Sequence, residues 1–379
     1  MIVDLADINA ALVDRLESWL PGLIGGQYDR TRKVWKAEAK RHGGLGDSLE
    51  VTMSGSHKGW FCHYAAGNKV GDALGLINYV KFGDADMKAA FAYARDVILQ
   101  GHVVELTKEE RDRIAARRAK EEAEAARKRE WKEKLAASIF LNECRDLLGT
   151  PVEKYFRDER SLDLRRLPYP IRALRYHPAL EHPQLKRKLP ALVAAVVHGD
   201  NKIRGIHRVW LVERRGKWDR VRGNGFEGFD KDGVEVDGKL SLGSVLGGAI
   251  RLWPGLRESD TTPGRWVRGH SWAKAPPGSL ITIAEAIEEG VTLAVAAPKR
   301  RVACGTAVNC FRFMALPEQF SQVVLAGNRD AEGSEADLEL KAGLEARLAE
   351  GRAASIAQPP GAKDWNAWWK ALVGERRSA

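Results

Sequence analysis

Between residues 279 and 371 the chain alternates short apolar runs with segments of helical spacing, and this pattern constrains the fold most. The apolar runs fall at 280–284, 301–304, 322–327 and 352–356, and the helix-like segments at 287–297, 306–315 and 333–350. Short apolar runs bounded by polar residues are typical of strands that are buried on both faces. Their alternation with helices predicts a parallel sheet with right-handed crossovers.

Two of these runs end in acidic or amide side chains. Residues 281–284 are followed by Glu285, and residues 323–327 are followed by Asn328 and Asp330. The carboxyl ends of parallel strands lie side by side, so we expect Glu285 and Asp330 to converge in one crevice. Clustered carboxylates suit the divalent ions that handle phosphates, and the pattern therefore favours Mg²⁺ or Mn²⁺, as one or two ions.

The arrangement resembles the Toprim domain of primases, topoisomerases and some nucleases, in which an acidic residue ends one strand and an Asp-x-Asp pair ends a later one. The resemblance implies that Glu285 and Asp330 are catalytic and bind metal. Asn328 stands where the family has its first Asp, and Ala286 replaces the usual glycine after the glutamate. An amide oxygen can bind Mg²⁺ but brings no charge, so a second ion should bind more weakly. Glu332 is the expected compensating ligand.

Residues 190–252 resemble the segment that precedes the Toprim domain in phage and plasmid primases, most recognisably at 239–243 and 247–252. Primases of this kind keep a positively charged ridge there, which would contact nucleotides or nucleic acid. The residues matched to it are Arg204, His207, Arg208, Lys239 and Arg251. Such cations would neutralise phosphates beside a carboxylate–metal centre. The alternative is that they are the polar face of ordinary strands, and His207 a packed strand residue.

Four further residues are candidate nucleotide or nucleic-acid contacts. Gly305 and Thr306 follow the strand between the two acidic segments; the glycine would allow a phosphate to approach, and Thr306 would donate to it. The alternative is that Thr306 caps the next helix. Residues 359–366 are similar to the closing motif of the family, which makes Lys363 and Asp364 candidates. Asp364 would position the metal or cap the final, tryptophan-rich helix.

The N-terminal part resembles a primase zinc-binding domain that has lost its metal, through residues 59–67 and 71–77. Tetrahedral zinc needs four ligands, and Cys62 and His63 have no second Cys or His pair nearby, so no zinc is expected. The pattern predicts a helix at 4–20 that stops at Pro21, several short strands at 25–64, and helices at 71–82 and 85–99. The basic residues of the strands would contact template: Arg30, Arg32, Lys33, Lys36, Lys40 and Arg41.

Composition narrows the classes of partner. The net charge of +10 favours nucleic acid. No apolar run reaches the length of a membrane span, and no secretory signal is visible. The four scattered cysteines indicate reduced thiols, and we expect a cytoplasmic protein of a bacterial host cell. A helix predicted at 107–147 is rich in Ala, Glu, Lys and Arg, and it would be a solvated spacer or lie on a partner.

The sequence thus predicts an α+β protein with an α/β, Rossmann-like Toprim domain. The expected segments are a zinc-less module at 1–103, a charged helix at 104–148, a basic lead-in domain at 149–278 and the Toprim domain at 279–379. The function implied by the resemblance is a DNA primase that joins nucleoside triphosphates on single-stranded DNA in phage or plasmid replication. A separate helicase would be needed, because the sequence has no G-x-x-x-x-G-K-[ST] string. A Toprim nuclease, a non-catalytic single-stranded nucleic-acid-binding replication factor and a host-interaction protein remain as alternatives.

Overall fold

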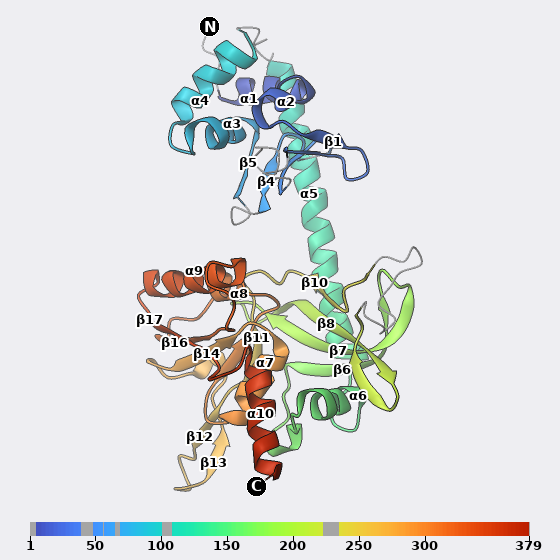
Figure 1. Ribbon diagram of the computed structural model, residues 1–379, viewed down its shortest axis with the longest axis vertical. Helices are drawn as coiled ribbons and strands as arrows, with labels where there is room; N and C mark the ends of the chain where they lie inside the picture. The colour runs from blue at the N-terminus through green and yellow to red at the C-terminus, as the bar shows by residue number, and fades with distance from the viewer. Residues whose placement is uncertain are drawn as a thin grey trace. The chain divides into compact units, whose positions relative to one another are not determined.

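The computed structural model describes residues 5–38, 48–55, 57–64, 69–100, 108–222 and 235–378 (Figure 1). The chain divides into two compact units, Met1–Ala126 and Arg127–Ala379. The division falls within the charged helix α5 (Lys108–Ser138). The expected module boundary at 103/104, the helix start at Thr107 and the basic residues Lys40 and Arg41 lie outside the described residues.

The N-terminal unit is built on a five-stranded antiparallel sheet in the order β1-β2-β3-β4-β5. The strands are β1 (Gln27–Asp29), β2 (Val34–Lys36), β3 (Leu49–Thr52), β4 (Phe61–His63) and β5 (Lys69–Gly71), and the helices are α1 (Leu5–Asp14), α2 (Leu16–Ile24), α3 (Ala73–Phe82) and α4 (Met87–Tyr93). The predicted stop at Pro21 is wrong, because α2 continues to Ile24. Leu20 and Ile24 are buried in the core, and their packing holds the last turn in spite of the proline.

Helix α5 is followed by a π-helical turn (Ile139–Glu143), and the helix ends there instead of at 147 as predicted. Tyr176 of the following sheet explains the early end. The backbone N–H of Arg145 donates to the carbonyl of Tyr176 at 2.7 Å, and the reciprocal bond is 2.8 Å. These bonds draw residue 145 into an extended bridge, so the helix cannot continue past it.

The lead-in part of the C-terminal unit is an antiparallel sheet in the order β10-β8-β7-β6, with β9 also paired to β8. Its strands are β6 (Leu174–His182), β7 (Arg187–Val197), β8 (Ile203–Arg214), β9 (Lys217–Arg220) and β10 (Lys239–Gly243); the short helix α6 (Pro151–Lys154) precedes them. Alternate residues of β7 enter different cores: Leu192 and Ala194 pack with the Toprim side, and Ala191 and Val193 pack beneath α5. Both faces of the central strands are therefore buried.

The second sheet has the order β11-β15-β14-β16-β17. Strands β14 (Leu280–Ala284), β15 (Val302–Cys304), β16 (Gln322–Ala326) and β17 (Ala353–Ala357) are parallel, and β11 (Ile250–Trp253) joins the edge antiparallel. Helices α7 (Ile287–Ala296) and α10 (Trp365–Ser378) share one core, and α8 (Cys310–Phe313) and α9 (Glu335–Ala349) share the core on the other face. The predicted strand–helix alternation is confirmed, although α8 is shorter than the segment expected at 306–315.

A two-stranded hairpin that the sequence pattern did not reveal lies between the two sheets in the chain. Its strands are β12 (Leu256–Glu258) and β13 (Trp266–Arg268). In Figure 1 the hairpin stands at the lower edge of the C-terminal unit, beyond the β14 end of the parallel sheet. No helix among the described residues is both long and apolar enough to cross a membrane.

Candidate functional site

The ends of β14 and β16 bring the predicted acidic segments together. Ala284 pairs with Ala326 in the parallel register, so Glu285 and Gly327 leave the sheet at the same edge. The amide Nδ2 of Asn328 donates to Glu285 Oε2 at 3.3 Å and to Glu289 Oε1 at 2.8 Å. A Cβ at Gly327 would lie 2.3 Å from Leu340 Cδ2, so a larger residue there would force the buried Leu340 side chain to move. The strand ends therefore form a crevice lined by carboxylates.

Asp330 lies near enough to Glu285 for its charge to affect the pKa of that residue. Burial raises the pKa of Glu285, the negative charge of Asp330 raises it further, and Lys239 opposes this rise. Arg329 does not close the crevice. Its Nε donates to the carbonyl of Pro359 at 2.8 Å, and among the described residues it forms no ion pair with Glu285 or Asp330. Two carboxylates that repel each other in a partly buried site favour the binding of a cation.

Glu289 is a member of the cluster that the sequence reasoning missed. Burial raises its pKa to about 7, against the opposing hydrogen bond from Asn328, and the charge of Glu285 adds to the rise. Glu289 Oε2 and Asn328 Oδ1 are buried and have no hydrogen-bond partner among the described residues. The sequence did contain a signal for Glu289. It lies four residues after Glu285 at the start of a helix, and residues with this spacing lie on the same helix face.

The crevice fits a hard cation that keeps part of its water shell. Mg²⁺ is commonly held by one or two carboxylates together with substrate phosphates. Glu285 and Asp330 supply such a pair, and the unpartnered oxygen of Asn328 is a neutral oxygen ligand. The described residues contain no group of three or more His, Cys, Asp or Glu side chains placed to hold a metal ion by themselves. Water and phosphate oxygens would have to complete the coordination.

Lys239 reaches the site from β10, and an ion pair with a buried glutamate holds it there. Lys239 Nζ lies 2.8 Å from Glu288 Oε1. Tyr155 donates its hydroxyl to the same oxygen at 3.0 Å, and Arg160 lies 4.0 Å away. Burial alone would raise the pKa of Glu288, but Lys239 and Arg160 hold it well below its usual range. The ammonium therefore lies beside the crevice, and its charge acts on both Glu288 and Glu285.

The other matched basic residues are engaged within the lead-in domain. Arg208 donates to the carbonyls of Leu240 at 3.3 Å and Ser241 at 3.1 Å, and burial lowers its pKa to about 10. His207 is buried and hydrogen-bonded to Ser241 Oγ at 3.1 Å, which agrees with a packed strand residue.

Arg204 and Arg251 are partly exposed and have local partners. Arg204 pairs with Asp200 at 2.7 Å and with Glu133 of α5 at 3.5 Å. Arg251 donates to Asn201 Oδ1 at 2.5 Å and lies over the Trp272 ring, 4.5 Å from its centroid. A role for these residues in nucleic-acid contact stays a prediction.

Comparison with known proteins identifies one domain. Residues 280–372 match the family described as "Toprim domain", and residues 130–252 match the family described as "Domain of unknown function (DUF7146)". Residues 280–372 form a Toprim domain. No curated protein matches the sequence.

Solved primase structures show a distant likeness to all or part of the chain. It is similar to the Aquifex aeolicus primase (zinc binding and RNA polymerase domains), with 13% identity, 100% of this chain and 84% of that chain covered, and a TM-score of 0.38. The DnaG primase catalytic domain bound to ssDNA is similar with 13% identity, over 67% of this chain and 80% of that chain, and with a TM-score of 0.37. The primase fragment of the bacteriophage T7 primase-helicase protein is similar with 16% identity, over 50% of this chain and 61% of that chain, and with a TM-score of 0.27. The functional argument therefore rests on the Toprim domain and the geometry of its site.

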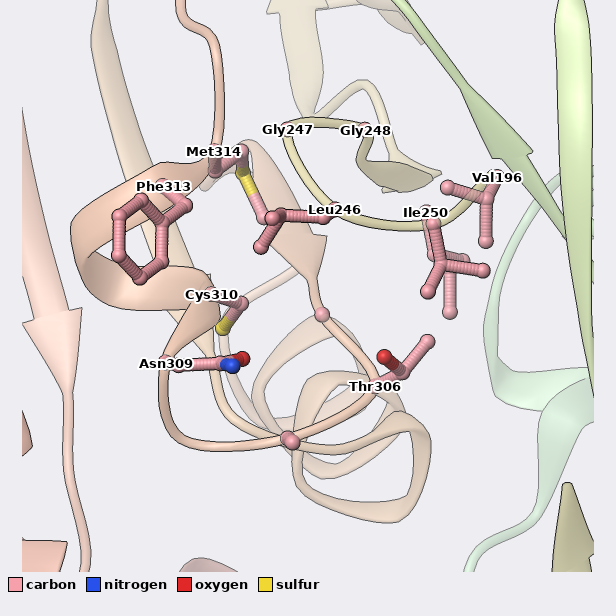
Figure 2. A pocket seen from close by; sticks show the side chains of 13 residues that line it. Val196, Leu246, Gly247, Gly248, Ile250, Thr306, Asn309, Cys310, Phe313 and Met314 are labelled. Carbon is pink, nitrogen blue, oxygen red and sulfur yellow. The ribbon is translucent and has the colours of Figure 1, made fainter. Parts of the chain in front are cut away.

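A pocket of about 310 Å³ opens beside the Toprim crevice (Figure 2). Gly305, Thr306 and Asn309 line it from the loop after β15, opposite Gly247 and Gly248 of the lead-in domain. Thr306 does not cap the next helix, because that helix begins at Cys310 with Asn309 at the cap position. Thr306 lies on the pocket wall, and its contact with a phosphate stays a prediction.

The remaining predicted residues of the Toprim domain lie around the rim. Asp364 caps α10, because its Oδ1 accepts the N–H of Ala367 at 2.7 Å. It is also near the cluster, since its charge contributes to the raised pKa of Glu289. Glu332 and Lys363 are exposed, and the charge of Glu332 acts on Lys341 of α9. The structure thus brings Glu285 and Asn328 into contact, with Asp330 near enough for its charge to act on Glu285, whereas Glu332 is exposed.

Proposed function

We propose that the protein is a DNA primase-like, metal-dependent nucleotidyltransferase that makes short primers on single-stranded DNA in phage or plasmid replication. The observation that carries the proposal is the convergence of Glu285 and Asp330 at the ends of neighbouring parallel strands of a Toprim domain. Lys239 supports a primase over a nuclease, because a separate antiparallel sheet delivers this cation to the edge of the crevice.

Glu285 and Asp330, with Asn328 Oδ1, would hold Mg²⁺ or Mn²⁺, and Glu332 is the more distant candidate ligand. The bound ion would activate the primer 3′-hydroxyl and neutralise the triphosphate. The Nδ2 of Asn328 keeps Glu285 and Glu289 in place by donating to both. Lys239 contributes positive charge where the phosphates would lie, and Thr306 would donate to a phosphate from the wall of the neighbouring pocket.

Primer synthesis on single-stranded DNA, with nucleoside triphosphates and Mg²⁺ or Mn²⁺, tests the proposal directly. We expect short labelled products from the wild type and none from Glu285→Gln. Glu345→Gln is a matched control, because it makes the same chemical change at an exposed position on α9. Unchanged thermal unfolding of both variants would show that folding is not the cause. Products from Glu285→Gln at the wild-type level would contradict the proposal.

One observation favours a second function, that of a non-catalytic single-stranded nucleic-acid-binding replication factor. Asn328 brings an uncharged amide where the family has an acid, and this amide already binds the two carboxylates. If the wild type makes no primer because it lacks a negative charge at position 328, Asn328→Asp should restore synthesis. Failure of both proteins, together with oligonucleotide binding that weakens steeply with salt, would favour the second function. Cleavage of the template would instead indicate a Toprim nuclease.

A further inference from the structure

The β12–β13 hairpin lies in a stretch that belongs to neither matched family. The two matches end at 252 and begin at 280, so residues 253–279 lie outside both of them. Trp266 at the start of β13 is 43% exposed. Lys299, from the turn between α7 and β15, places its Nζ 3.7 Å from the centroid of the Trp266 ring. The exposed indole and the ammonium therefore lie together on the surface, where a flat aromatic face and a positive charge are both accessible.

A basic pocket of about 460 Å³ adjoins the hairpin. Arg257, Lys299, Arg300 and Arg301 all line it. Lys299 and Arg300 are exposed and form no ion pair within the part of the chain that the structure describes. Arg257 is paired with the exposed Asp260 at 2.8 Å, and the buried Arg301 donates to the carbonyl of His270 at 2.8 Å. The pocket therefore carries excess positive charge.

Close backbone packing fixes the hairpin against the basic turn. Gly255 has φ +75, and a Cβ there would lie 2.8 Å from the carbonyl oxygen of Lys299. The N–H of Gly269 donates to the carbonyl of Gly255 at 2.8 Å, and a Cβ at Gly269 would lie 2.2 Å from the carbonyl oxygen of Pro254. Because larger residues would push these segments apart, the two glycines hold the Trp266 strand and the 299–301 turn in one arrangement.

The pocket is at the opposite end of the sheet from the carboxylate crevice. Ser279 and Leu280 at the start of β14, and Arg301 just before β15, line the pocket, whereas Glu285 follows the end of β14. A strand of five residues spans roughly 16 Å. A phosphate bound by Arg300 would therefore lie too far from the carboxylate crevice to contact it, and the pocket is a separate site.

We propose that this pocket and the adjoining Trp266 ring form a second binding site for single-stranded nucleic acid, with Trp266 stacking on a base and Lys299 and Arg300 contacting the flanking phosphates. An aromatic platform beside paired cations is the arrangement that binds single strands without reading their sequence. That the bound strand is the template rests on the proposed function; the binding itself does not. A site for an acidic protein would need the cations but not the exposed indole ring.

Fluorescence anisotropy with a labelled oligothymidylate of about 16 nucleotides tests the site on the full chain, without nucleotides or metal. Trp266→Ala should weaken binding about 10-fold, whereas Trp266→Phe should bind close to the wild type because a ring remains. Lys299→Ala combined with Arg300→Ala should lower the slope of log K against log salt by about 1.4, since each phosphate contact contributes about 0.7. Lys188→Ala with Lys217→Ala removes two exposed cations elsewhere and is the matched control.

The outcomes separate this site from the proposed catalysis. If the Trp266 and Lys299/Arg300 variants bind as the wild type does at every salt concentration, or if the Lys188/Lys217 control loses as much, the second site is overturned. If the basic pair matters but Trp266→Ala binds normally, the site is one for an acidic partner and the proposal fails. A protein that makes no primer but shows the predicted differences would keep the second site and lose the proposed function.

Discussion

At the scale of single residues, the ion pair between Lys239 and Glu288 should contribute measurably to stability. Lys239→Met would leave the buried Glu288 carboxylate with only Arg160, 4.0 Å away, as a cation, and the free energy of unfolding should fall by about 3 kcal/mol. Adding Glu288→Gln should recover most of the loss, because Tyr155 can still donate to the amide oxygen. Urea unfolding of the two proteins checks this. Equal losses in both would show that the lysine stabilises the protein by packing and not by its charge.

His207 should make stability depend on pH. Burial, with the nearby Lys239, lowers its pKa from the ordinary value of 6.5 to about 4. Between these values the unfolded chain binds a proton that the folded chain does not, so stability should fall as pH falls from 6.5 towards 4. The loss due to this residue should reach about 3 kcal/mol, at about 1.4 kcal/mol per pKa unit.

Urea unfolding at pH 7 and pH 4.5 measures the effect of His207. The His207→Gln variant keeps a polar partner for Ser241 and cannot be protonated. Other groups also titrate in this range, so the difference between the two proteins is the informative quantity. The wild type should lose more stability than the variant on acidification. Parallel curves would mean that His207 is protonated in the folded protein as readily as in the unfolded one.

At the scale of elements, Asp364 distinguishes a helix cap from a metal-positioning residue. Its Oδ1 accepts the Ala367 N–H at the start of α10. Asp364→Ser keeps a capping oxygen and removes the charge, so stability should change little, whereas Asp364→Ala should cost about 1 kcal/mol. If Asp364 acts only as a cap, Asp364→Ser should also make primer as the wild type does. Normal stability with lost synthesis would show a role at the metal instead.

The elements of the Toprim domain were predictable because their order follows from local patterns. Apolar runs of strand length and the helical segments between them gave β14, β16 and β17, and the acidic residues after two runs gave the crevice. The end of helix α5 and the β12–β13 hairpin were less predictable from the sequence. The early end of α5 depends on the bridge to Tyr176, and the hairpin is held by glycine contacts with the 299–301 turn. Such contacts between distant segments leave no periodicity in the sequence.

At the scale of the whole molecule, the site needs two sheets at once. Lys239 comes from the antiparallel lead-in sheet and Glu288 from the Toprim domain, and β11 joins the edge of the parallel sheet. The sequence placed basic residues in the lead-in segment but could not show which would reach the carboxylates. Arg208 was matched to the same ridge, yet its guanidinium is hydrogen-bonded to backbone carbonyls of β10. Burial decided between these residues, and burial depends on the assembled fold.

Each of the two units should fold by itself. The apolar core of the N-terminal unit runs from Ile8 to Leu99, and the three apolar clusters of the C-terminal unit all lie between Ala136 and Trp369. A fragment of residues 127–379 keeps all three clusters and the buried Lys239–Glu288 pair, so its melting temperature in scanning calorimetry should match that of the corresponding transition in the full chain. The fragment of residues 1–126 should give a separate transition. A fragment 127–379 that melts well below the full-chain transition would show that the C-terminal unit depends on residues before 127 for its stability.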